Sequence, residues 1–425
     1  MSTVEKQNFP ISQDFESIYP ENEKEVADII KKHYKSGKAI EIVGSGSKRK
    51  IGKPIQCEKI LNFSKLEGII EYLPEELYIK VKTGTKIDKI ENELTKNKQQ
   101  LAFEPIDFGY LFLGKSNCGT AGGHVSCNIS GPRRFKSGSI RDHILGFRAV
   151  NGRGEIIKSG GTVVKNVTGY DLSKLICNSY GTLAALTEIT FKVLPAAPES
   201  KTLIIHNLDL SFSTQYLEKA ISTPVEVSGA SFLPVDPICN SCEMNIKDTI
   251  KLNDLKYEGS MTAMRLEGSK KSIDERMKNL KKELNVSNKS ISILDTFQSE
   301  IFWKKIRNLE IFSATKNNII RIVIPPSECC KLIYELPKNF KYFLDWGGSL
   351  IWMEACELTE HIFESIRKKV VKHGGYLSMI KNSDYLPYVE DVFTIDRARF
   401  NISQNIKKSF DPKRILNPGK MYTGI

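Results

Sequence analysis

The sequence has little of what marks membrane, secreted or metal-binding proteins. No apolar run approaches the ~20 residues that span a bilayer, and the opening MSTVEKQNFP has no apolar signal core. Nine cysteines, an odd number, stand at spacings that indicate no disulfide framework. The lone CxxC, Cys239-Asn-Ser-Cys242, has no second pair at cluster spacing, and the six histidines form no metal-binding pair. These absences favour a reducing cytoplasm and predict no metal site.

Long runs of one charge are missing as well. Lys and Arg total 62 against 50 Asp and Glu, a net charge of +12, yet no run of five or more like charges occurs, as a binding tail would need. We therefore expect no nucleic acid partner. Hydrophobic residues make up 40% of the 425 residues, which supports packed cores in two or three domains.

One segment matches the sequence pattern of a phosphate-binding P-loop but does not meet its structural requirements. The stretch Gly109-Tyr-Leu-Phe-Leu-Gly-Lys-Ser116 has the right spacing. A P-loop, however, needs small residues whose amides wrap phosphate, and a helix behind its lysine. Here the intervening residues are bulky, and Asn117-Cys-Gly-Thr-Ala-Gly-Gly123 follows in place of a helix. We interpret the match as chance.

Glycine is concentrated where a ligand could approach the backbone, since residues 118–195 hold 12 of the 29 glycines. Small residues form one loop at Gly44-Ser-Gly-Ser47, after a predicted strand, and another at Thr120-Ala-Gly-Gly123. The first loop is not a Rossmann fingerprint, because Arg49 takes the third glycine position. A tight turn and a close-packed backbone crossing are the structural alternatives. Two such loops in one domain favour a diphosphate held between them.

Arginine gathers beside these loops. Five of the 14 arginines fall within 21 residues, and this residue type makes bidentate contacts with phosphate or carboxylate. A solvated face is the alternative for each one. His124, in the second loop, and His143 are each either ligand-facing or packed structurally. The five arginines are Arg133, Arg134, Arg141, Arg148 and Arg153.

Alternating patterns predict a β-α-β style of domain up to residue 195. Helices are expected over 21–36 and 86–98, and strands over 39–43, 77–81, 144–150, 155–158 and 183–193. The two-proline stretch 196–200 is the expected boundary. Beyond it, glycine becomes sparse, which predicts a second, α+β domain. Its expected elements include a helix over 270–284 and strands over 319–324 and 350–354.

Longer ordered segments resemble a known family. From about residue 10 to its end, the chain resembles the FAD-binding PCMH-type proteins of the vanillyl-alcohol oxidase superfamily, and among them the FAD-binding subunits of bacterial glycolate oxidases. The segments that carry the resemblance are Gly131-Pro-Arg-Arg-Phe-Lys-Ser-Gly-Ser-Ile-Arg-Asp142, Gly160-Gly-Thr-Val-Val-Lys-Asn-Val-Thr-Gly-Tyr-Asp-Leu172, Ser179-Tyr-Gly-Thr-Leu-Ala-Ala-Leu-Thr-Glu-Ile189, Asp345-Trp-Gly-Gly348 and Asn417-Pro-Gly-Lys-Met-Tyr422.

This resemblance implies an α+β protein with three segments. Residues 1–197 would form a PCMH-type FAD-binding domain of two α/β subdomains, 198–405 an α+β cap domain, and 406–425 a C-terminal segment that returns to the FAD domain. Lys165, Asn166, Gly169 and Tyr170 would lie in the inner layer of the fold. The implied FAD-binding residues are Val43, Gly44, Ser45, Gly46, Ser47 and Lys48 in the first loop, Thr120, Ala121, Gly122, Gly123, His124 and Ser126 in the second, and Gly131, Ser139, Arg141, Asp142, Ile189, Asn417 and Lys420.

Two departures from the family pattern bear on the chemistry. The first loop has no His, the residue that often carries a covalent flavin in this family, so we predict non-covalent FAD. The His-x-Gly-Asp-Gly-Asn-x-His metal motif of related D-2-hydroxyacid dehydrogenases is also absent, so the familiar site that orients an α-hydroxy carboxylate is missing. No catalytic residue is assigned; the candidates are His124, Arg133, Arg134 and His143.

The resemblance implies an oxidoreductase subunit of a glycolate or D-2-hydroxyacid dehydrogenase complex. Its partners would be a D-type FAD subunit and an iron–sulfur subunit, and its reaction the oxidation of glycolate to glyoxylate. It would lie in the cytoplasm, or peripherally at the inner membrane through the complex. Two alternatives stay open. One is a free-standing FAD-dependent 2-hydroxyacid oxidoreductase, with Arg133 or Arg134 on the carboxylate and His124 or His143 as base. The other is a non-catalytic assembly subunit.

Overall fold

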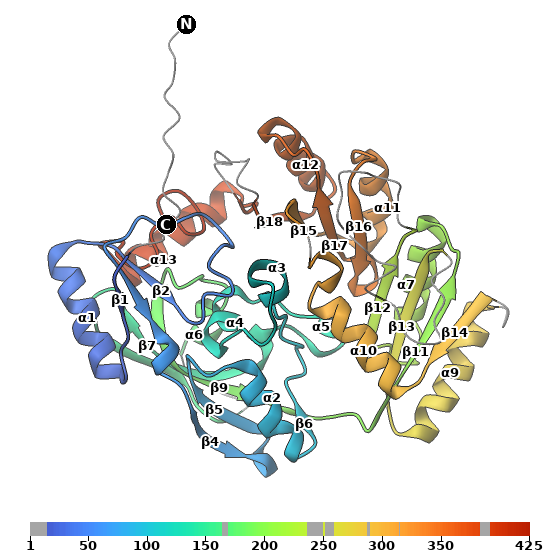
Figure 1. The fold of residues 1–425 in the computed structure, drawn as a ribbon, viewed down its shortest axis with the longest axis horizontal. Coiled ribbons are helices and arrows are strands. Elements are labelled where there is room, and N and C mark those ends of the chain that lie inside the picture. Colours follow the sequence, from blue (N-terminus) through green and yellow to red (C-terminus); the bar gives the residue numbers. More distant parts are fainter. Residues whose placement is uncertain are drawn as a thin grey trace, which may run out of the picture.

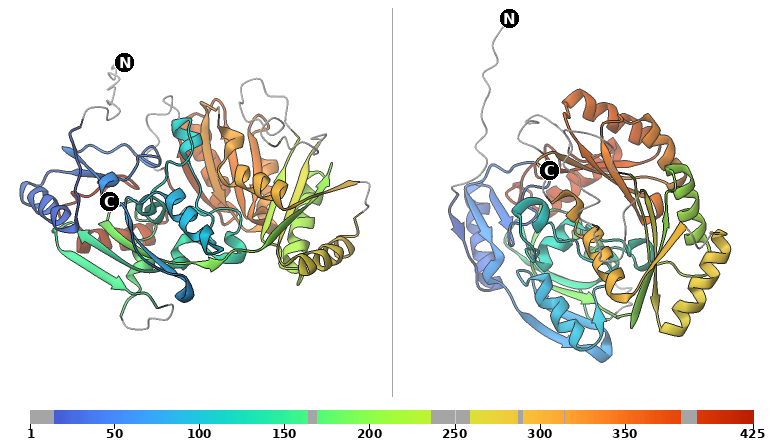
Figure 2. Two further views of the ribbon diagram at one scale, coloured as in Figure 1. Left: turned by 60° about the horizontal axis from the view of Figure 1, so that its bottom comes forward. Right: turned by 45° about the vertical axis from the view of Figure 1, so that its right-hand side comes forward.

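The structure is a computed structural model that describes residues 15–163, 169–235, 250, 259–286, 290–313, 315–382 and 392–425. The predicted CxxC at Cys239 and Cys242, and also Lys165 and Asn166, lie outside the described residues. The chain builds two parts that lie side by side, each with a sheet at its centre (Figures 1 and 2).

The first part contains two main sheets. Five antiparallel strands form the larger one, in the order β4 (Ile69–Leu73), β5 (Tyr78–Lys82), β9 (Ala184–Lys192), β7 (Ile144–Asn151) and β8 (Ile156–Gly160). Three parallel strands form the smaller one, in the order β1 (Ser17–Ile18), β3 (Lys59–Asn62) and β2 (Ile40–Val43). The helices are α1 (Glu23–Ser36), α2 (Ile87–Lys96), α3 (Gly109–Leu113), α4 (Ala121–Cys127), α5 (Arg134–Ser137) and α6 (Leu172–Ile176), with short 3₁₀ turns η1 (Phe63–Lys65), η2 (Pro74–Glu76) and η3 (Ile140–His143).

Apolar side chains cover both faces of the five-stranded sheet. Residues of α2, α4 and α6 pack with β5, β7 and β9 in one core, while α1 and the small sheet pack against β7 and β9 in another. Helix α1 begins where the Asn22 side chain accepts the Glu25 N–H at 3.0 Å, and it ends at Gly37, whose φ of 72° suits a residue without Cβ. This layering leaves the end of β2 facing β9 and the start of α4.

The second part is an eight-stranded antiparallel sheet with helices packed against both of its faces. A short pair, β6 (Gln99–Gln100) and β10 (Leu194–Pro195), precedes it. The strand order is β14 (Ile291–Leu294), β11 (Glu199–His206), β13 (Met261–Gly268), β12 (Gly229–Leu233), β16 (Lys341–Asp345), β17 (Leu350–Ala355), β15 (Asn318–Val323) and β18 (Tyr376–Lys381). The helices are α7 (Leu210–Ser222), α9 (Lys270–Leu284), α10 (Thr296–Arg307), α11 (Pro326–Glu335) and α12 (Glu360–Lys372), with turns η5 (Glu310–Phe312) and η6 (Trp346–Gly348).

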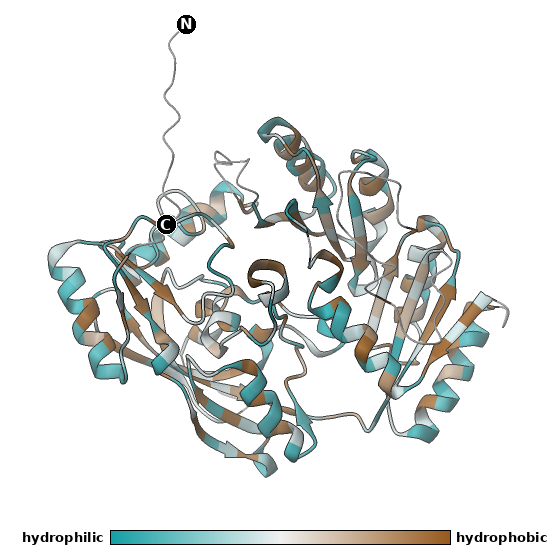
Figure 3. Ribbon diagram, in the orientation of Figure 1, coloured by the Kyte–Doolittle hydropathy of each residue, from teal (hydrophilic) through white to brown (hydrophobic). Residues whose placement is uncertain are grey.

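The two faces of this sheet differ. Helices α7, α9, α11 and α12 lie on the side away from the first part, and α10 lies on the side toward it (Figure 1). Helix α9 carries hydrophilic residues on its solvent side and buries Ile273, Met277, Leu280 and Leu284 (Figure 3). The inner face therefore meets the first part of the chain along a seam, and that seam contains buried charged side chains.

The C-terminal segment crosses back to the first part. Helix α13 (Arg397–Phe410) ends at Asp411, which accepts hydrogen bonds from the N–H groups of Ile415 and Leu416 at 3.1 and 2.8 Å. Leu416 then bridges in parallel to Ile40, at the start of β2. The tail thus adds a short edge to the small sheet, next to the end of β2.

The structure confirms the expected α+β class and each of the predicted helices and strands, with ends shifted by at most two residues. The division into segments 1–197, 198–405 and 406–425 stays a prediction. Tyr170 is 92% exposed, so the expectation that it lies in an inner layer is wrong. In the described part, no helix is long and apolar enough to cross a membrane.

The cysteines follow the sequence expectation only in part. Six of them are free in the described residues, but Cys356, just after β17, is disulfide-bonded. A covalent link of this kind is uncommon in a reducing compartment. The cytoplasmic location therefore stays a prediction. The cysteine spacing favoured it, and the disulfide at Cys356 weakens that support.

Candidate functional site

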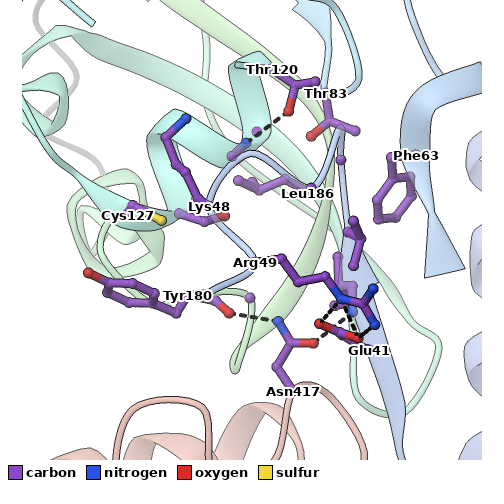
Figure 4. A pocket seen from close by; sticks show the side chains of 18 of the residues that line it. Glu41, Lys48, Arg49, Phe63, Thr83, Thr120, Cys127, Tyr180, Leu186 and Asn417 are labelled. Atoms are coloured by element: carbon purple, nitrogen blue, oxygen red, sulfur yellow. Dashed lines mark hydrogen bonds and ion pairs between the residues drawn. The ribbon is translucent and has the colours of Figure 1, made fainter. Parts of the chain in front are cut away.

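An open cavity with about 740 Å³ of empty space lies between the two sheets of the first part (Figure 4). The end of β2, the start of β9, the first turn of α4 and the C-terminal tail meet around it. Its wall is lined by Glu41, Ile42, Val43, Gly44, Ser45, Gly46, Ser47, Lys48, Arg49, Ile55, Phe63, Thr83, Thr120, Gly122, Gly123, Ser126, Cys127, Tyr180, Gly181, Ala184, Leu186, Asn417 and Lys420.

The loop after β2 presents backbone amides to this cavity. Its turn is closed by the Arg49 N–H, which donates to the Gly46 carbonyl at 3.1 Å, and Gly46 has a φ of +80°. Within the described residues, the N–H groups from Gly44 to Lys48 donate no hydrogen bond to the chain. Five successive amides at a cavity wall can therefore cradle an anion.

Glycines let the two small-residue loops approach each other. A Cβ on Gly44 would stand 2.4 Å from the Thr120 Oγ1, and one on Gly122 would stand 1.9 Å from the Thr83 Oγ1. Neither distance is compatible with a side chain. The glycines thus keep the cavity wall thin where backbone must lie close to a ligand.

The second loop contributes small side chains to the cavity wall, and two of its backbone amides are already bonded within the chain. The Ala121 N–H donates to the Thr85 carbonyl at 2.8 Å, and the Gly122 N–H donates to the Thr83 carbonyl at 2.9 Å. Thr120 caps α4 by accepting the Gly123 N–H at 3.4 Å. Because these donors are already bonded within the chain, the loop contributes small side chains to the wall, and the first loop contributes the free amides.

Positive charge lines the cavity. Burial lowers the pKa of Lys48 and of Lys420 to about 8 in each case. Lys420 Nζ donates to the Arg49 carbonyl at 2.6 Å, so it also ties the tail to the first loop. Arg49 is bound to the buried Glu41 through contacts of 2.6 to 3.0 Å. Among the described residues that line the cavity, one carboxylate accompanies three cations, which leaves a site suited to a diphosphate.

The tail also fixes the far wall. The Asn417 side chain accepts the Ile42 N–H at 2.7 Å and donates to the Tyr180 carbonyl at 2.7 Å (Figure 4). Tyr180 itself has a φ of 52°, which is unusual for a residue with a bulky side chain. Asn417 therefore joins the end of β2 to a strained turn on the opposite side of the cavity.

The structure brings together most, but not all, of the residues predicted to bind FAD. All six of the first loop, together with Thr120, Gly122, Gly123, Ser126, Asn417 and Lys420, line the cavity. The others lie outside its wall. Those others are Ala121, His124, Gly131, Ser139, Arg141, Asp142 and Ile189.

Several of these outlying residues have evident structural roles. Asp142 accepts from both the backbone and the hydroxyl of Ser139, at 2.8 and 2.9 Å, in a capping box. His124 is buried, with Nδ1 2.9 Å from the Thr120 carbonyl and Nε2 2.9 Å from the Ile106 carbonyl. Burial, then the charge of Lys48, lowers its pKa to about 3. Both ring nitrogens also lie 3.3 to 3.4 Å from Nζ of Lys48, a lining residue, so His124 packs directly behind the cavity wall.

The candidate catalytic residues are dispersed. Arg133 is held by Glu267 at 2.7 and 2.9 Å in a buried ion cluster, and His143 Nε2 lies 2.8 Å from the Ser137 carbonyl. Neither lines the cavity. Arg134 stacks on the ring of Trp346, 4.5 Å from its centroid. Of the two arginine candidates, Arg134 has no ion pair in the described residues, whereas Arg133 is paired.

Sequence reasoning missed part of the wall. Tyr180 and Gly181 lie in a segment that carried the family resemblance, so that segment held the signal for them. Thr83 follows β5 in a Thr-Gly-Thr turn, another small-residue loop. Ala184 and Leu186 lie in the same segment as Tyr180. No local pattern marks the remaining lining residues, which are Glu41, Ile42, Arg49, Ile55, Phe63 and Cys127.

Comparison with known proteins agrees with this geometry. The chain matches the FAD binding domain family over residues 17–160 and the C-terminal domain of FAD linked oxidases over 352–421. It is 31% identical to glycolate oxidase subunit GlcE of Escherichia coli (strain K12), over 90% of this chain and 93% of that one. It is 23% identical to glycolate oxidase subunit GlcD of Bacillus subtilis (strain 168), over 87% of this chain and 80% of that one.

Solved structures show the same fold. A 4-ethylphenol oxidase from Gulosibacter chungangensis superposes with a TM-score of 0.69 at 12% identity, covering 98% of this chain and 92% of that one. A p-cresol methylhydroxylase superposes with a TM-score of 0.68 at 13% identity, covering 96% of this chain and 88% of that one. At this identity the likeness concerns the fold alone.

Fold and cavity together define an FAD-binding oxidoreductase. The free amides of the first loop, the glycines at which a Cβ would fill the wall, and the excess of cations fit a flavin dinucleotide. The chain belongs to the FAD-linked oxidase family to which the E. coli subunit GlcE also belongs.

Proposed function

We propose that this chain is the FAD-carrying subunit of a complex that oxidises a small 2-hydroxy acid, with glycolate as the substrate and glyoxylate as the product. One observation carries the proposal. A cavity with five free amides and three cations lies in a chain that is similar to a glycolate oxidase subunit over 90% of its length. Electrons would leave through an iron–sulfur subunit, and a D-type FAD subunit would be the second partner.

The residues of this chain would hold the cofactor and exclude water from it. The amides from Gly44 to Lys48 would bind the diphosphate, and the charges of Lys48 and Lys420 would offset its negative charge. When bound, FAD supplies two-electron acceptor chemistry for the oxidation of an alcohol carbon. Leu186 and Phe63 would supply an apolar wall that keeps water away from the cofactor.

We further propose that the cofactor is held without a covalent bond. The loop from Gly44 to Lys48 contains no His, and His124, which does not line the cavity, has both ring nitrogens 2.9 Å from backbone carbonyls. Cys127 lines the cavity, but burial raises its pKa to about 11, which keeps the thiol protonated.

The colour of the purified chain tests this proposal. We expect a yellow protein with flavin absorbance near ~450 nm, and we expect acid precipitation to leave the flavin in the supernatant. Yellow colour that stays with the pellet would contradict the non-covalent proposal. A colourless chain that does not bind added FAD would contradict the proposed function as a whole.

Reconstitution separates the complex from the alternative. We expect glycolate to reduce the flavin of this chain only after the D-type and iron–sulfur subunits are added. Reduction of the lone chain by glycolate or D-lactate would instead support a free-standing 2-hydroxyacid oxidoreductase. Arg134, stacked on Trp346 and without an ion pair in the described residues, is the observation that favours this second function.

A further inference from the structure

Arg321 occupies an unusual place in the seam between the two parts of the chain. It lies in the middle of β15, opposite Trp352 of β17 and Ser378 of β18. Residues directly opposite each other in an antiparallel sheet project to the same face. Arg321, Trp352 and Ser378 therefore share one face of the eight-stranded sheet.

Aromatic rings hold the Arg321 guanidinium, and among the described residues no acidic group pairs with it. Its carbon lies 5.1 Å from the centroid of Trp346 and 5.8 Å from that of Trp352. The Nε atom is buried and has no hydrogen-bond partner. In the described part of the chain, no hydrogen bond or ion pair joins this guanidinium to another residue. Arg265, on the same sheet, is by contrast bound to Glu104 at 2.8 and 3.1 Å.

A second cation stands nearby and increases the electrostatic cost. Arg134 lies 4.5 Å from the centroid of the same Trp346 ring. Burial, and then the repulsion from Arg134, lowers the pKa of Arg321 to about 10. Two guanidinium groups beside one indole, neither of them ion-paired within the described residues, form a site that an anion would stabilise.

This cation pair is close to the cavity described above. Tyr180 lines that cavity, and its hydroxyl and Arg321 interact electrostatically. The Tyr180 ring lies 5.1 Å from the ring of Phe393, which bridges to Ser378, the register partner of Arg321. Tyr180 thus lies both at the wall of the cofactor cavity and near Arg321.

We propose that Arg321, assisted by Arg134 across Trp346, binds the carboxylate of a small organic acid beside the cofactor cavity. As the binding site for the acid group of a 2-hydroxy acid, this proposal rests on the proposed function; as an anion site, it stands independently. The two indole faces leave the edge of the guanidinium as its hydrogen-bonding surface. A planar carboxylate matches that edge with two parallel hydrogen bonds.

Tryptophan fluorescence of the full-length chain tests the site directly. Two of the three tryptophans flank Arg321, so an anion bound there changes their emission whether or not FAD is present. The chain would be titrated with glycolate, D-lactate, oxalate and inorganic phosphate, both flavin-free and loaded with FAD. We expect saturable changes with the carboxylates, and weaker binding of phosphate.

Substitutions assign the signal to its residue. Arg321→Gln should weaken carboxylate binding at least tenfold, because it removes both the charge and the paired donors. Arg321→Lys keeps the charge without the planar donors, so its carboxylate affinity should fall between those of the parent and of Arg321→Gln. Arg134→Gln should lose less carboxylate affinity than Arg321→Gln. The control is Arg153→Gln, in the β7–β8 turn, which should bind like the parent. A thermal melt of each variant shows whether it is folded.

Two results would overturn the proposal. One is a folded parent chain whose tryptophan emission no carboxylate changes, and the other is an Arg321→Gln or Arg321→Lys variant that binds as tightly as the parent. Tighter binding of phosphate than of any carboxylate would overturn the choice of ligand. The flavin-free titration keeps these results separate from the proposed function, which fails if FAD does not bind.

Discussion

Gly44 and Thr120 meet at the closest approach of the two small-residue loops. The substitution Gly44→Ala places a methyl group 2.4 Å from the Thr120 hydroxyl oxygen, so one of the loops must move. We expect a loss of about 1 to 3 kcal/mol in the free energy of unfolding, typical of overpacking. We also expect weaker FAD binding, because the displaced loop carries the free amides.

A double-mutant cycle isolates this contact. Thr120→Ala alone should cost about 1 kcal/mol, since it removes the cap of α4. In Gly44→Ala/Thr120→Ala the clashing oxygen is gone, so the double variant should lose less than the sum of the two single losses. Urea denaturation of the four proteins measures the coupling. Strict additivity would show that the two loops do not touch there.

Lys48 gives the chain a measurable dependence on pH. Its pKa is lowered to about 8 by burial, against about 10.4 in an unfolded chain. The folded state therefore carries the full penalty of a buried ammonium below pH 8 and loses that penalty as the pH rises toward ~10.4. We expect the free energy of unfolding of Lys48→Met, relative to that of the parent, to be higher at pH 7 than at pH 10. The change between the two pH values should be up to about 3 kcal/mol.

The exposed neighbour Lys50 provides the matched control. Lys50→Met removes a lysine of the same charge from an exposed position two residues away, so the pH dependence of Lys48→Met is judged against it. Denaturation of the flavin-free chain at pH 7, 8, 9 and 10 gives both curves. A Lys48→Met difference that does not change with pH would show that the ammonium is not desolvated.

At the scale of single residues, the sequence predicts what depends on local conformation. The first loop was identifiable because small residues after a strand are a local pattern, and its amides are free where that pattern indicates. Tyr180 and Arg321 carry no such pattern. They come close through the packing of segments about 140 residues apart, and their environment exists only in the folded chain.

Among the elements, the C-terminal tail has the most direct effect on the cavity. Asn417 bonds to the Ile42 N–H and the Tyr180 carbonyl, and it stands on a segment that pairs with β2. Asn417→Asp keeps the acceptor but loses the donor, and it places a carboxylate oxygen against the Tyr180 carbonyl. We expect at least a tenfold weaker affinity for FAD and a lower melting temperature.

Exposed Asn401 in α13 is the control position for this prediction. Asn401→Asp changes the same side chain on the same C-terminal segment without touching the cavity, and it should bind FAD like the parent. Flavin fluorescence titration gives the affinities. Equal affinities for the Asn417→Asp and parent chains would mean that the tail does not shape the cavity.

Periodic elements were the most predictable ones. The amphipathic helix at 270–284 is found with those bounds, whereas β1, β3 and β4 were not predicted. The structure agrees that the P-loop match is chance. A P-loop needs a helix behind its lysine, whereas α3 ends before Lys115, and Lys115 is exposed.

On the scale of the whole molecule, a buried ion cluster joins the two parts of the chain. Glu104 and Arg133 come from the first part, and Arg265 and Glu267 come from β13 of the second. Despite their burial, the two arginines hold the pKa of each carboxyl below its usual range. Trp346 adds a hydrogen bond across the same seam, to the Gly131 carbonyl at 3.0 Å. The position of Arg321 relative to the cavity depends on this joint.

Breaking the cluster should therefore affect both stability and the distant anion site. Glu267→Gln leaves Arg133 and Arg265 with one carboxylate between them, and removal of one partner from a buried ion group costs about 3 to 5 kcal/mol. The surface variant Glu275→Gln, which loses only an exposed pair with Lys278, should cost less than about 0.5 kcal/mol. If Glu267→Gln unfolds like Glu275→Gln, the cluster does not hold the seam. If it is destabilised as expected and also binds carboxylates more weakly, although Glu267 does not contact Arg321, the joint between the two parts sets the geometry of the site.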